Sequence, residues 1–305
     1  MKISFTIIAY NEEKNIANCI NSILNQEELK DYEIVAVNDA SNDKTSEIVK
    51  DLIKKNNHIK LVDLKENRGR GNARFVGVEN SRGDYIAFVD ADCILPKNWL
   101  KVCLSYLKEY DAVGGIAVPD GDVTYISQRF NLTPKIIPHT TGITGSNAIY
   151  KREIFKKIKL NSNLRGGEDT DLNWNIHKAG FKIKLIPELI VKHKENINYT
   201  QSVKRMFSFG KGATKLLKRH KKIRLPDLAF FGFIILLIWN LFLIFIGEFR
   251  YILLVILYPL LTSFLHLYSK FKMNNILNFI IACFFNYFLM LFYYYGRIIG
   301  FFKDE

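Results

Sequence analysis

The chain has 305 residues, 49% of them hydrophobic, and a formal net charge of +13 at pH 7. An intrinsically disordered chain holds too few apolar residues to match this composition, and an ordinary soluble enzyme seldom combines so much apolar content with so much basic charge. The length suffices for one sizeable domain with additional segments.

The N-terminus and the cysteines indicate a reducing, cytoplasmic setting. Met1-Lys2 is followed by only a short apolar stretch, residues 3–9, and then by polar residues, which is not the pattern of a signal peptide. We therefore expect roughly the first 200 residues to stay on the cytoplasmic side. The cysteines form no CxxC pair, which favours reduced, buried thiols over a disulfide or zinc framework. They are Cys19, Cys93, Cys103 and Cys283.

The first 120 residues alternate β-like runs, rich in Ile, Val and aromatic residues, with helical stretches. The predicted strands are residues 3–10, 32–38, 59–64 and 85–90. The predicted helices are residues 12–25, 44–55 and 72–80. This alternation predicts βαβ units in an α/β sandwich with a mixed, mainly parallel sheet. Ligands of such sheets bind beyond the C-terminal ends of the strands.

Polar residues stand at three of these strand ends: Tyr10-Asn11-Glu12, Asn38-Asp39 and Asp90-Ala91-Asp92. Residues i and i+2 of an extended segment point the same way, so Asp90 and Asp92 can converge on one site. Two close carboxylates repel each other unless a cation lies between them, and a hard ion such as Mg²⁺ or Mn²⁺ takes oxygen ligands. A DxD pattern alone is weak, since a surface turn with two solvated Asp residues has the same letters. Its place directly after an apolar strand favours a site.

The segment 202–224 carries nine Lys or Arg residues and no Asp or Glu. Its apolar and small residues recur at helical spacing, which predicts an amphipathic basic helix suited to an anionic membrane surface. Nucleic-acid binding is the rival interpretation of a basic run. The apolar segment that follows within a few residues argues against nucleic acid and for membrane lipid as the partner.

Three later segments have no charged residue apart from His266, if that ring is protonated: residues 228–247, 251–269 and 273–296. Each is close to the roughly 20 residues that a helix needs to cross a bilayer. We expect three spans, with two spans and one interfacial or re-entrant segment as the alternative. With no acid or base embedded in them, the spans offer no polar pathway for a transporter. The predicted organisation is a catalytic domain at 1–200, a basic juxtamembrane helix at 201–226 and a membrane domain at 227–305.

Loop charges give a predicted orientation for these spans. The loop "GEFR" is nearly neutral and the loop with Lys270 and Lys272 is basic, which favours the first outside and the second inside. A third crossing then places residues 303–305 outside. The margin is small, because Arg297 and Lys303 favour the inside.

Six motifs occur in order: "SFTIIAYNEEKNI", "VNDASNDKT", "ENRGRGNARFVG", "FVDADC", "GSNAIYKREIF" and "GGEDTDLNW". Together they resemble the family 2 glycosyltransferases, over about the first two-thirds of the chain. The resemblance implies a GT-A nucleotide-sugar fold, a hexosyltransferase-type enzyme and an inverting, metal-dependent transfer from a nucleotide-diphospho-sugar of the UDP or GDP type.

The resemblance implies a donor site at the strand ends. Tyr10 can border the base, and Glu12 and Asp39 can accept hydrogen bonds from base or ribose. The alternatives are a helix N-terminal charge for Glu12 and a turn or cap with Ser41 for Asp39. The other nucleotide-sugar-binding residues predicted are Arg68, Arg74, Asp90 and Ala91.

Metal ligation is expected from Asp92, with Asp90 shared between metal and ribose. His193 is a weaker candidate, because related enzymes often place a His beside the metal or the diphosphate. The implied cofactor is Mg²⁺ or Mn²⁺.

The likeness assigns the general base to Asp169, the Asp of the Glu-Asp pair, since an acceptor hydroxyl must lose its proton as it attacks. A favourable charge at a helix N-terminus is the alternative for Asp169, and Asp171 is expected to be structural. The predicted acceptor-side residues are Gly145, Ser146, Asn147 and Glu168. A plain loop role is expected for His139.

These features predict transfer to a hydroxyl of a lipid-linked saccharide or an envelope polysaccharide at the cytoplasmic membrane face. The main alternative is a polyprenyl-phosphate glycosyltransferase, similar to dolichyl-phosphate mannose synthases, whose ionised acceptor requires no base. The Glu168-Asp169 pair favours the hydroxyl acceptor. A non-catalytic, sugar-binding membrane scaffold is the remote alternative.

Overall fold

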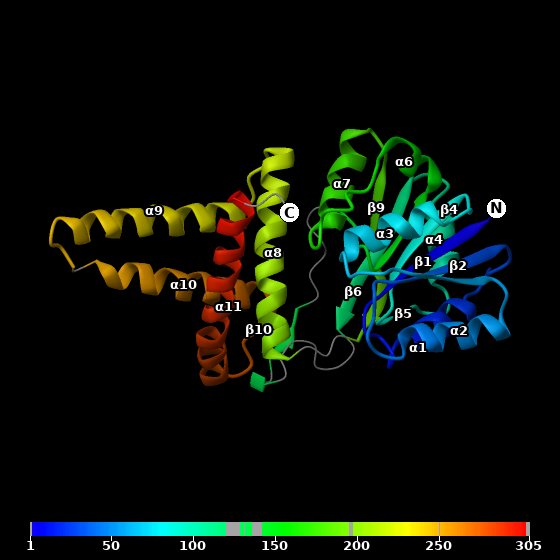
Figure 1. Ribbon diagram of the computed structural model, residues 1–305, viewed down its shortest axis with the longest axis horizontal. Coiled ribbons are helices and arrows are strands. Elements are labelled where there is room, and N and C mark those ends of the chain that lie inside the picture. Colours follow the sequence, from blue (N-terminus) through cyan, green and yellow to red (C-terminus); the bar gives the residue numbers. More distant parts are fainter. Residues whose placement is uncertain are drawn as a thin grey trace. The chain divides into compact units, whose positions relative to one another are not determined.

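The computed structural model describes residues 2–119, 129–130, 132–135, 142–194, 198–249 and 251–302 (Figure 1). The chain divides into two compact units. The first comprises residues 1–121 and 136–195, and the second comprises residues 122–135 and 196–305. Residues 122–135, which the sequence places within the catalytic domain, therefore group with the C-terminal segment.

The first unit is built on an eight-stranded sheet in the order β3-β2-β1-β4-β8-β6-β9-β5. Its strands are β1 (Ile3–Ala9), β2 (Tyr32–Asn38), β3 (Ile59–Asp63), β4 (Tyr85–Asp90), β5 (Cys93–Ile94), β6 (Ala112–Pro119), β8 (Asn147–Lys151) and β9 (Ile183–His193). Neighbours from β3 to β4 are parallel, as are β6 and β9, whereas β8 is antiparallel to both β4 and β6. This topology confirms the predicted mixed, mainly parallel sheet.

Helices cover both faces of this sheet because alternate strand residues point to opposite sides. The helices are α1 (Ile16–Leu24), α2 (Thr45–Lys55), α3 (Arg70–Glu79), α4 (Trp99–Tyr106), α6 (Arg152–Lys157) and α7 (Glu168–Lys178). One core joins Phe5 and Ile7 of β1 to α1, α2 and α4, and a second joins Ile86 and Phe88 of β4 to α3, α6 and α7. All four cysteines are free and buried, as predicted.

The helix predicted to begin at Glu12 begins instead at Ile16. Asn11 adopts a left-handed backbone conformation, with φ at 58°, which breaks the strand and redirects the chain. The backbone amide of Glu12 then donates to Thr45 Oγ1 at 2.8 Å. Residues 12–15 are thus held as a turn by the first residue of α2, and this tertiary bond shortens the helix.

The second unit contains α8 (Tyr199–His220), α9 (Leu225–Phe245), α10 (Ile252–Lys270) and α11 (Ile276–Phe302). A two-stranded sheet of β7 (Thr133–Pro134) and β10 (Phe271–Lys272) completes it. Among the described residues, α9, α10 and α11 are long and apolar enough to cross a membrane, with mean hydropathy of 2.7, 1.8 and 2.0. These helices confirm the predicted membrane-anchoring segments.

Two of these helices extend beyond the charge-free stretches of the sequence and bring charges with them. Helix α9 includes Asp227, and α11 continues past Gly296 through Arg297. Both side chains are fully buried, and Arg297 Nη2 lies 2.6 Å from Asp227 Oδ1. The charge-free stretches 228–247, 251–269 and 273–296 are as the sequence has them, and the ion pair joins the ends by which the two helices extend past those stretches. The pairing could not be read from the sequence, because Asp227 and Arg297 are 70 residues apart and each lies just outside a charge-free stretch.

Candidate active site

The loops that follow β1 and β2 are tied together at the C-terminal edge of the sheet. Ser41 Oγ accepts a hydrogen bond from the Asn11 amide at 2.9 Å, and Asn11 Oδ1 accepts one from the Asn42 amide at 2.8 Å. Tyr10, at the start of the first loop, remains 45% exposed. The edge therefore presents an aromatic ring beside a fixed backbone, an arrangement suited to a nucleotide base.

Asp39 fixes a third loop to this edge. Its carboxylate is buried and accepts hydrogen bonds from the backbone amides of Arg68 at 3.0 Å and Gly69 at 2.8 Å. Ser41, the alternative partner of Asp39 in a turn, instead bonds to Asn38. The Asp39 carboxylate thus orders the loop before α3. Its contact with the base or ribose of a donor stays a prediction.

Arg68 and Arg74, both predicted to bind the donor, lie in different surroundings. Arg68 is exposed, and its Nε donates to Glu66 at 2.7 Å. Arg74 is 3% exposed, and its Nη2 lies 2.7 Å from Asp90 Oδ1 while its Nη1 pairs with Glu168. Arg74 thus joins the end of β4 to the start of α7. Burial alone lowers its pKa, but Asp90 and Glu168 raise it above the usual value, so the group stays charged.

The packing around Gly145 requires a glycine, for a reason that the sequence did not indicate. A Cβ atom at this position would lie 2.7 Å from Arg74 Cζ, closer than a real contact allows. The small residue therefore makes room for the guanidinium. Asn147 is fully buried, and its amide group bonds to Trp99 Nε1 and to the carbonyl of Leu189. These contacts give Asn147 a place in the core, so Gly145 and Ser146 remain the predicted acceptor-side residues of this loop.

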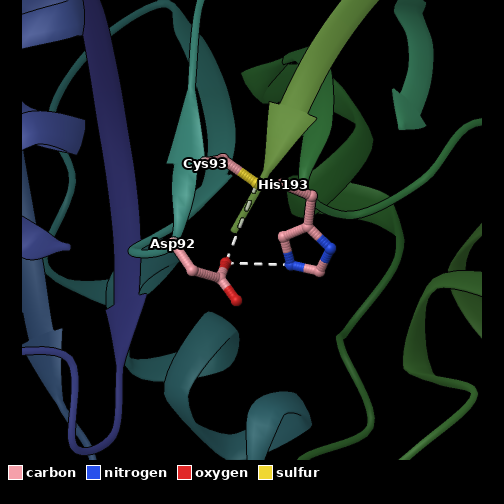
Figure 2. Close-up of side chains that lie close together, drawn as sticks. All are labelled: Asp92, Cys93 and His193. Atoms are coloured by element: carbon pink, nitrogen blue, oxygen red, sulfur yellow. Dashed lines mark hydrogen bonds and ion pairs between the residues drawn. The ribbon is translucent and has the colours of Figure 1, made fainter. Parts of the chain in front are cut away.

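Asp92, Cys93 and His193 form a cluster beside the strand end (Figure 2). The pairing of β5 with β9 places Cys93 opposite His193. His193 Nε2 lies 2.9 Å from Asp92 Oδ1, and Cys93 Sγ lies 3.8 Å from the same oxygen. The structure thus brings His193 to Asp92 from a strand about 100 residues later, where the sequence offered only a lone histidine.

The donor atoms of this cluster fit a divalent cation of intermediate hardness. Burial, and then the charges of Asp90 and Asp92, raise the pKa of the Cys93 thiol well above its usual value, which keeps it protonated. A protonated thiol is a poor ligand for Mg²⁺ or Mn²⁺. The remaining carboxylate and imidazole suit Mn²⁺, since Mg²⁺ prefers oxygen ligands alone.

Glu12 is electrostatically part of the same site. Burial, followed by the nearby charge of Asp92, raises the pKa of its carboxyl to about 7. Asn15 Nδ2 donates to Glu12 Oε2 at 2.8 Å, which opposes this shift. Several carboxyl groups therefore share a small region that one added positive charge would stabilise.

This shift predicts that the metal-free protein loses stability as pH rises. The folded-state pKa of Glu12 lies above that of the unfolded chain, so the folded state binds more protons between about pH 4.5 and 7. The free energy of unfolding should therefore fall across that window. Thermal unfolding of the full chain with chelator, at pH 5 and 7.5, measures it. Glu12→Gln should flatten the profile, whereas Glu13→Gln, at an exposed position of the same turn, should leave it unchanged.

Asp169 lies in the first turn of α7, half-buried, with its Oδ1 accepting a hydrogen bond from the Thr170 amide at 2.7 Å. Its side chain borders a small cavity. Residues of the cavity wall include Arg74, Phe88, Gly145, Tyr150 and Glu168. The structure thus brings Glu168, Asp169 and Gly145 together with Arg74, which is predicted to bind the donor. Tyr150 is a lining residue that the sequence analysis missed, because it reads as an ordinary core position of a strand.

Asp171 is buried in the same turn and accepts a hydrogen bond from Asn175 Nδ2 at 3.2 Å, which fits its expected structural role. His139 lies outside the described residues.

A family model described as glycosyl transferase family 2 matches residues 4–159, just over half of the chain. The chain belongs to glycosyl transferase family 2. This confirms the membership that the ordered motifs predicted. The match covers the strand ends and the Arg74 segment, whereas Asp169 and His193 lie beyond it.

Relatives of this family 2 chain include named enzymes. The poly-beta-1,6-N-acetyl-D-glucosamine synthase of Staphylococcus epidermidis is 25% identical over 202 residues, which cover 62% of this chain and 48% of the relative. The uncharacterized glycosyltransferase EpsJ of Bacillus subtilis is 28% identical over 214 residues, covering 64% of this chain and 62% of EpsJ. The chain thus spans only part of the length of these relatives.

A third relative matches over a longer stretch. The dolichyl N-acetyl-alpha-D-glucosaminyl phosphate 3-beta-D-2,3-diacetamido-2,3-dideoxy-beta-D-glucuronosyltransferase of Methanococcus voltae is 26% identical over 261 residues. The match covers 77% of this chain and 80% of that enzyme.

Solved structures share the fold of the family 2 chain. The mannosyltransferase PcManGT from Pyrobaculum calidifontis, in complex with GDP-Man and Mn²⁺, superposes with a TM-score of 0.58 at 19% identity, covering 73% of this chain and 65% of PcManGT. S. aureus TarS 1–349 in complex with UDP-GlcNAc gives a TM-score of 0.53 at 18% identity, covering 92% and 90%. At these identities the likeness shows the fold alone, and it confirms the predicted GT-A nucleotide-sugar fold.

Proposed function

We propose that this glycosyltransferase moves a sugar, with inversion, from a nucleotide-diphospho-sugar to a hydroxyl of a lipid-linked saccharide or envelope polysaccharide at the cytoplasmic membrane face. The observation that carries the proposal is the junction of Arg74, Asp90 and Glu168, which joins the end of β4 to the start of α7 next to Asp169. A general base held beside the donor site is what attack by a hydroxyl requires.

The donor side uses the ordered loops. The exposed ring of Tyr10 borders the base, and Asp39 orders the loop of Arg68, which reaches a phosphate from the surface. Neighbours of this fold bind GDP-Man and UDP-GlcNAc, which supports a nucleotide-sugar donor without choosing between the two bases.

Asp92 and His193 would hold the divalent cation, with Asp90 nearby. When bound, the ion would offset the negative charge of the leaving diphosphate. The complex of PcManGT with Mn²⁺ supports a metal of this kind.

Metal dependence gives a direct prediction about these two residues. Asp92→Ala should remove Mn²⁺ binding, and His193→Ala should weaken binding of Mn²⁺ more than that of Mg²⁺, because the imidazole matters only to the softer ion. Isothermal titration of the full chain with each metal, with and without UDP or GDP, measures both effects. Asp51→Ala, at an exposed position paired with Lys54, is the matched control. Unchanged Mn²⁺ affinity in both site variants would remove the cluster from the proposal.

The acceptor is a hydroxyl, since a hydroxyl must lose a proton to a base such as Asp169. A phosphate acceptor is already ionised and needs no base. The name of the Methanococcus voltae relative describes transfer involving a sugar on dolichyl phosphate, which supports a lipid-linked saccharide. The apolar helices α9, α10 and α11 would keep the enzyme where such an acceptor resides.

The proposal is tested by screening UDP- and GDP-sugars for binding to the full chain and then offering two acceptors. A lipid-linked saccharide should be glycosylated, and the new bond should have the anomeric configuration opposite to that of the donor. Transfer to polyprenyl phosphate alone would favour the alternative phosphate-acceptor activity. Failure to bind or turn over any nucleotide sugar would favour a non-catalytic scaffold.

A further inference from the structure

Helix α11 runs beside α8 and in the same direction (Figure 1). The rings of Tyr199 and Phe285 are 6.3 Å apart near the start of the contact, and those of Phe207 and Tyr295 are 5.5 Å apart further along. Lys218 Nζ donates to the carbonyl of Phe301 at 2.9 Å near its end. The two helices therefore stay together over almost the full length of α8.

Glycines allow this close approach. A Cβ atom at Gly210 would lie 2.1 Å from the Tyr293 carbonyl oxygen, and one at Gly296 would lie 2.1 Å from the Phe207 carbonyl oxygen. The backbones thus touch where these residues meet, as is common where helices pack tightly in membrane proteins. Helix α11 must share the orientation of α8 to keep this contact.

Helix α8 is unsuited to crossing a bilayer. It carries six Lys or Arg residues and no Asp or Glu, and each basic side chain is costly at the bilayer centre. A basic amphipathic helix lies in the interface plane instead. The helix that runs beside it, α11, then lies in that plane too.

Helix α11 also passes across the base of the α9–α10 hairpin, which extends across the direction of α8 and α11 (Figure 1). In the N-terminal half of α9, the ring of Phe233 stacks on that of Tyr294 at 4.8 Å, and Asp227 pairs with Arg297. At the C-terminal half of α10, Ser263 Oγ donates to the Cys283 carbonyl at 2.7 Å. The helix therefore touches the ends of the hairpin that connect to the rest of the chain.

Both ends of α11 lie at the base of the α9–α10 hairpin, where α9 begins and α10 ends. Its start follows β10, and β10 pairs with β7, which belongs to the excursion of the chain between β6 and β8 of the catalytic sheet. That excursion contains no apolar run long enough to cross a membrane. The end of α11 meets the start of α9, directly after α8. A continuous helix with both ends on one face of the membrane does not span it.

We infer that α11 lies in the membrane interface beside α8, and that the chain crosses the bilayer only through α9 and α10. The partner of this surface is an anionic bilayer. Basic residues of α8 meet the headgroups, and the exposed apolar side chains of α11 meet the acyl chains. These side chains include Leu277, Ile280, Phe284, Phe288 and Tyr295.

This disposition also accounts for the buried ion pair. Arg297 and Asp227 lie at the base of the hairpin, at headgroup depth, where Arg224 Nε reaches the same carboxylate at 3.2 Å. A charged group costs less there than at the bilayer centre. Arg297 is thus part of a contact between helices. It is not a loop residue whose charge would orient the C-terminus.

The test is cysteine labelling of the full chain in intact cells with a membrane-impermeant maleimide. Phe249→Cys, in the exposed α9–α10 loop, should label from outside. Met273→Cys and Phe302→Cys, at the two ends of α11, should label only after permeabilisation. The parent chain, with four buried cysteines, gives the background. Labelling of Phe302→Cys from outside would overturn the inference, and so would labelling of Phe249→Cys only from inside.

Depth measurements provide a second, independent readout. Nitroxide labels at Ile280→Cys, Phe288→Cys and Tyr295→Cys, in vesicles containing phosphatidylglycerol, should report one shared shallow depth by power saturation. A spanning helix would separate Ile280 from Tyr295 by about 22 Å along the membrane normal and place Phe288 deepest. That gradient would overturn the inference. Neither readout depends on glycosyl transfer.

Discussion

Asp169→Asn is expected to reduce turnover by a factor of about 10² to 10⁴ while donor affinity changes little, since the loss of a general base removes this much rate. The side chain is half-buried and lines the small cavity that Glu168 and Arg74 also line. The measurement is initial-rate kinetics on purified full-length enzyme, together with titration of the nucleotide sugar.

The competing role for Asp169 is a favourable charge at the start of α7, which contributes roughly 0.3–1 kcal/mol. Asp171→Asn separates the two roles, because it removes a charge from the same turn at a buried position bonded to Asn175. We expect Asp171→Asn to lower the melting temperature and to keep turnover per folded molecule. If Asp169→Asn behaves in the same way, Asp169 is not the base.

Arg74→Met is expected to give the largest loss of stability in the catalytic unit. It leaves the buried carboxylate of Glu168 and the part-buried carboxylate of Asp90 without their main partner, and breaking a buried pair costs about 3–5 kcal/mol. Donor binding should fail as well, since Asp90 loses its position. Arg74→Lys should recover little, because an ammonium group cannot serve two carboxylates in a fixed plane. Chemical denaturation and nucleotide titration measure these effects.

Two variants control this experiment. Arg68→Met removes an exposed arginine paired with exposed Glu66 and should cost less than about 1 kcal/mol. Adding Glu168→Gln to Arg74→Met removes one of the stranded charges and should restore part of the stability. A single Arg74→Met variant as stable as Arg68→Met would show that the junction does not hold the two sides together.

The sequence predicted the central strands well. Residues 32–38 and 85–90 coincide with β2 and β4, because runs of Ile, Val and aromatic residues fit a strand buried on both faces. The placement of Asp39, Asp90 and Asp92 at one edge followed from parallel pairing. In this chain, local patterns encode the sheet and the polar residues at its C-terminal edge.

The contacts that organise the site were not predictable in the same way. Arg74 reads as a phosphate-binding arginine after glycines, and only the fold brings Glu168, 94 residues later, to its guanidinium. His193 lies close to Asp92 because β5 pairs with β9, and β5 is only two residues long. Such contacts arise from tertiary packing, which short-range propensity does not record.

The hydrogen bonds of Asp39 and Asn11 have a consequence for the energetics of donor binding. They order three loops before any nucleotide arrives, so little conformational entropy remains to be lost on association. Binding should then proceed without a slow folding step and with a heat-capacity change no larger than the contact area requires. The rigidity of these three loops is set by hydrogen bonds within the polypeptide itself.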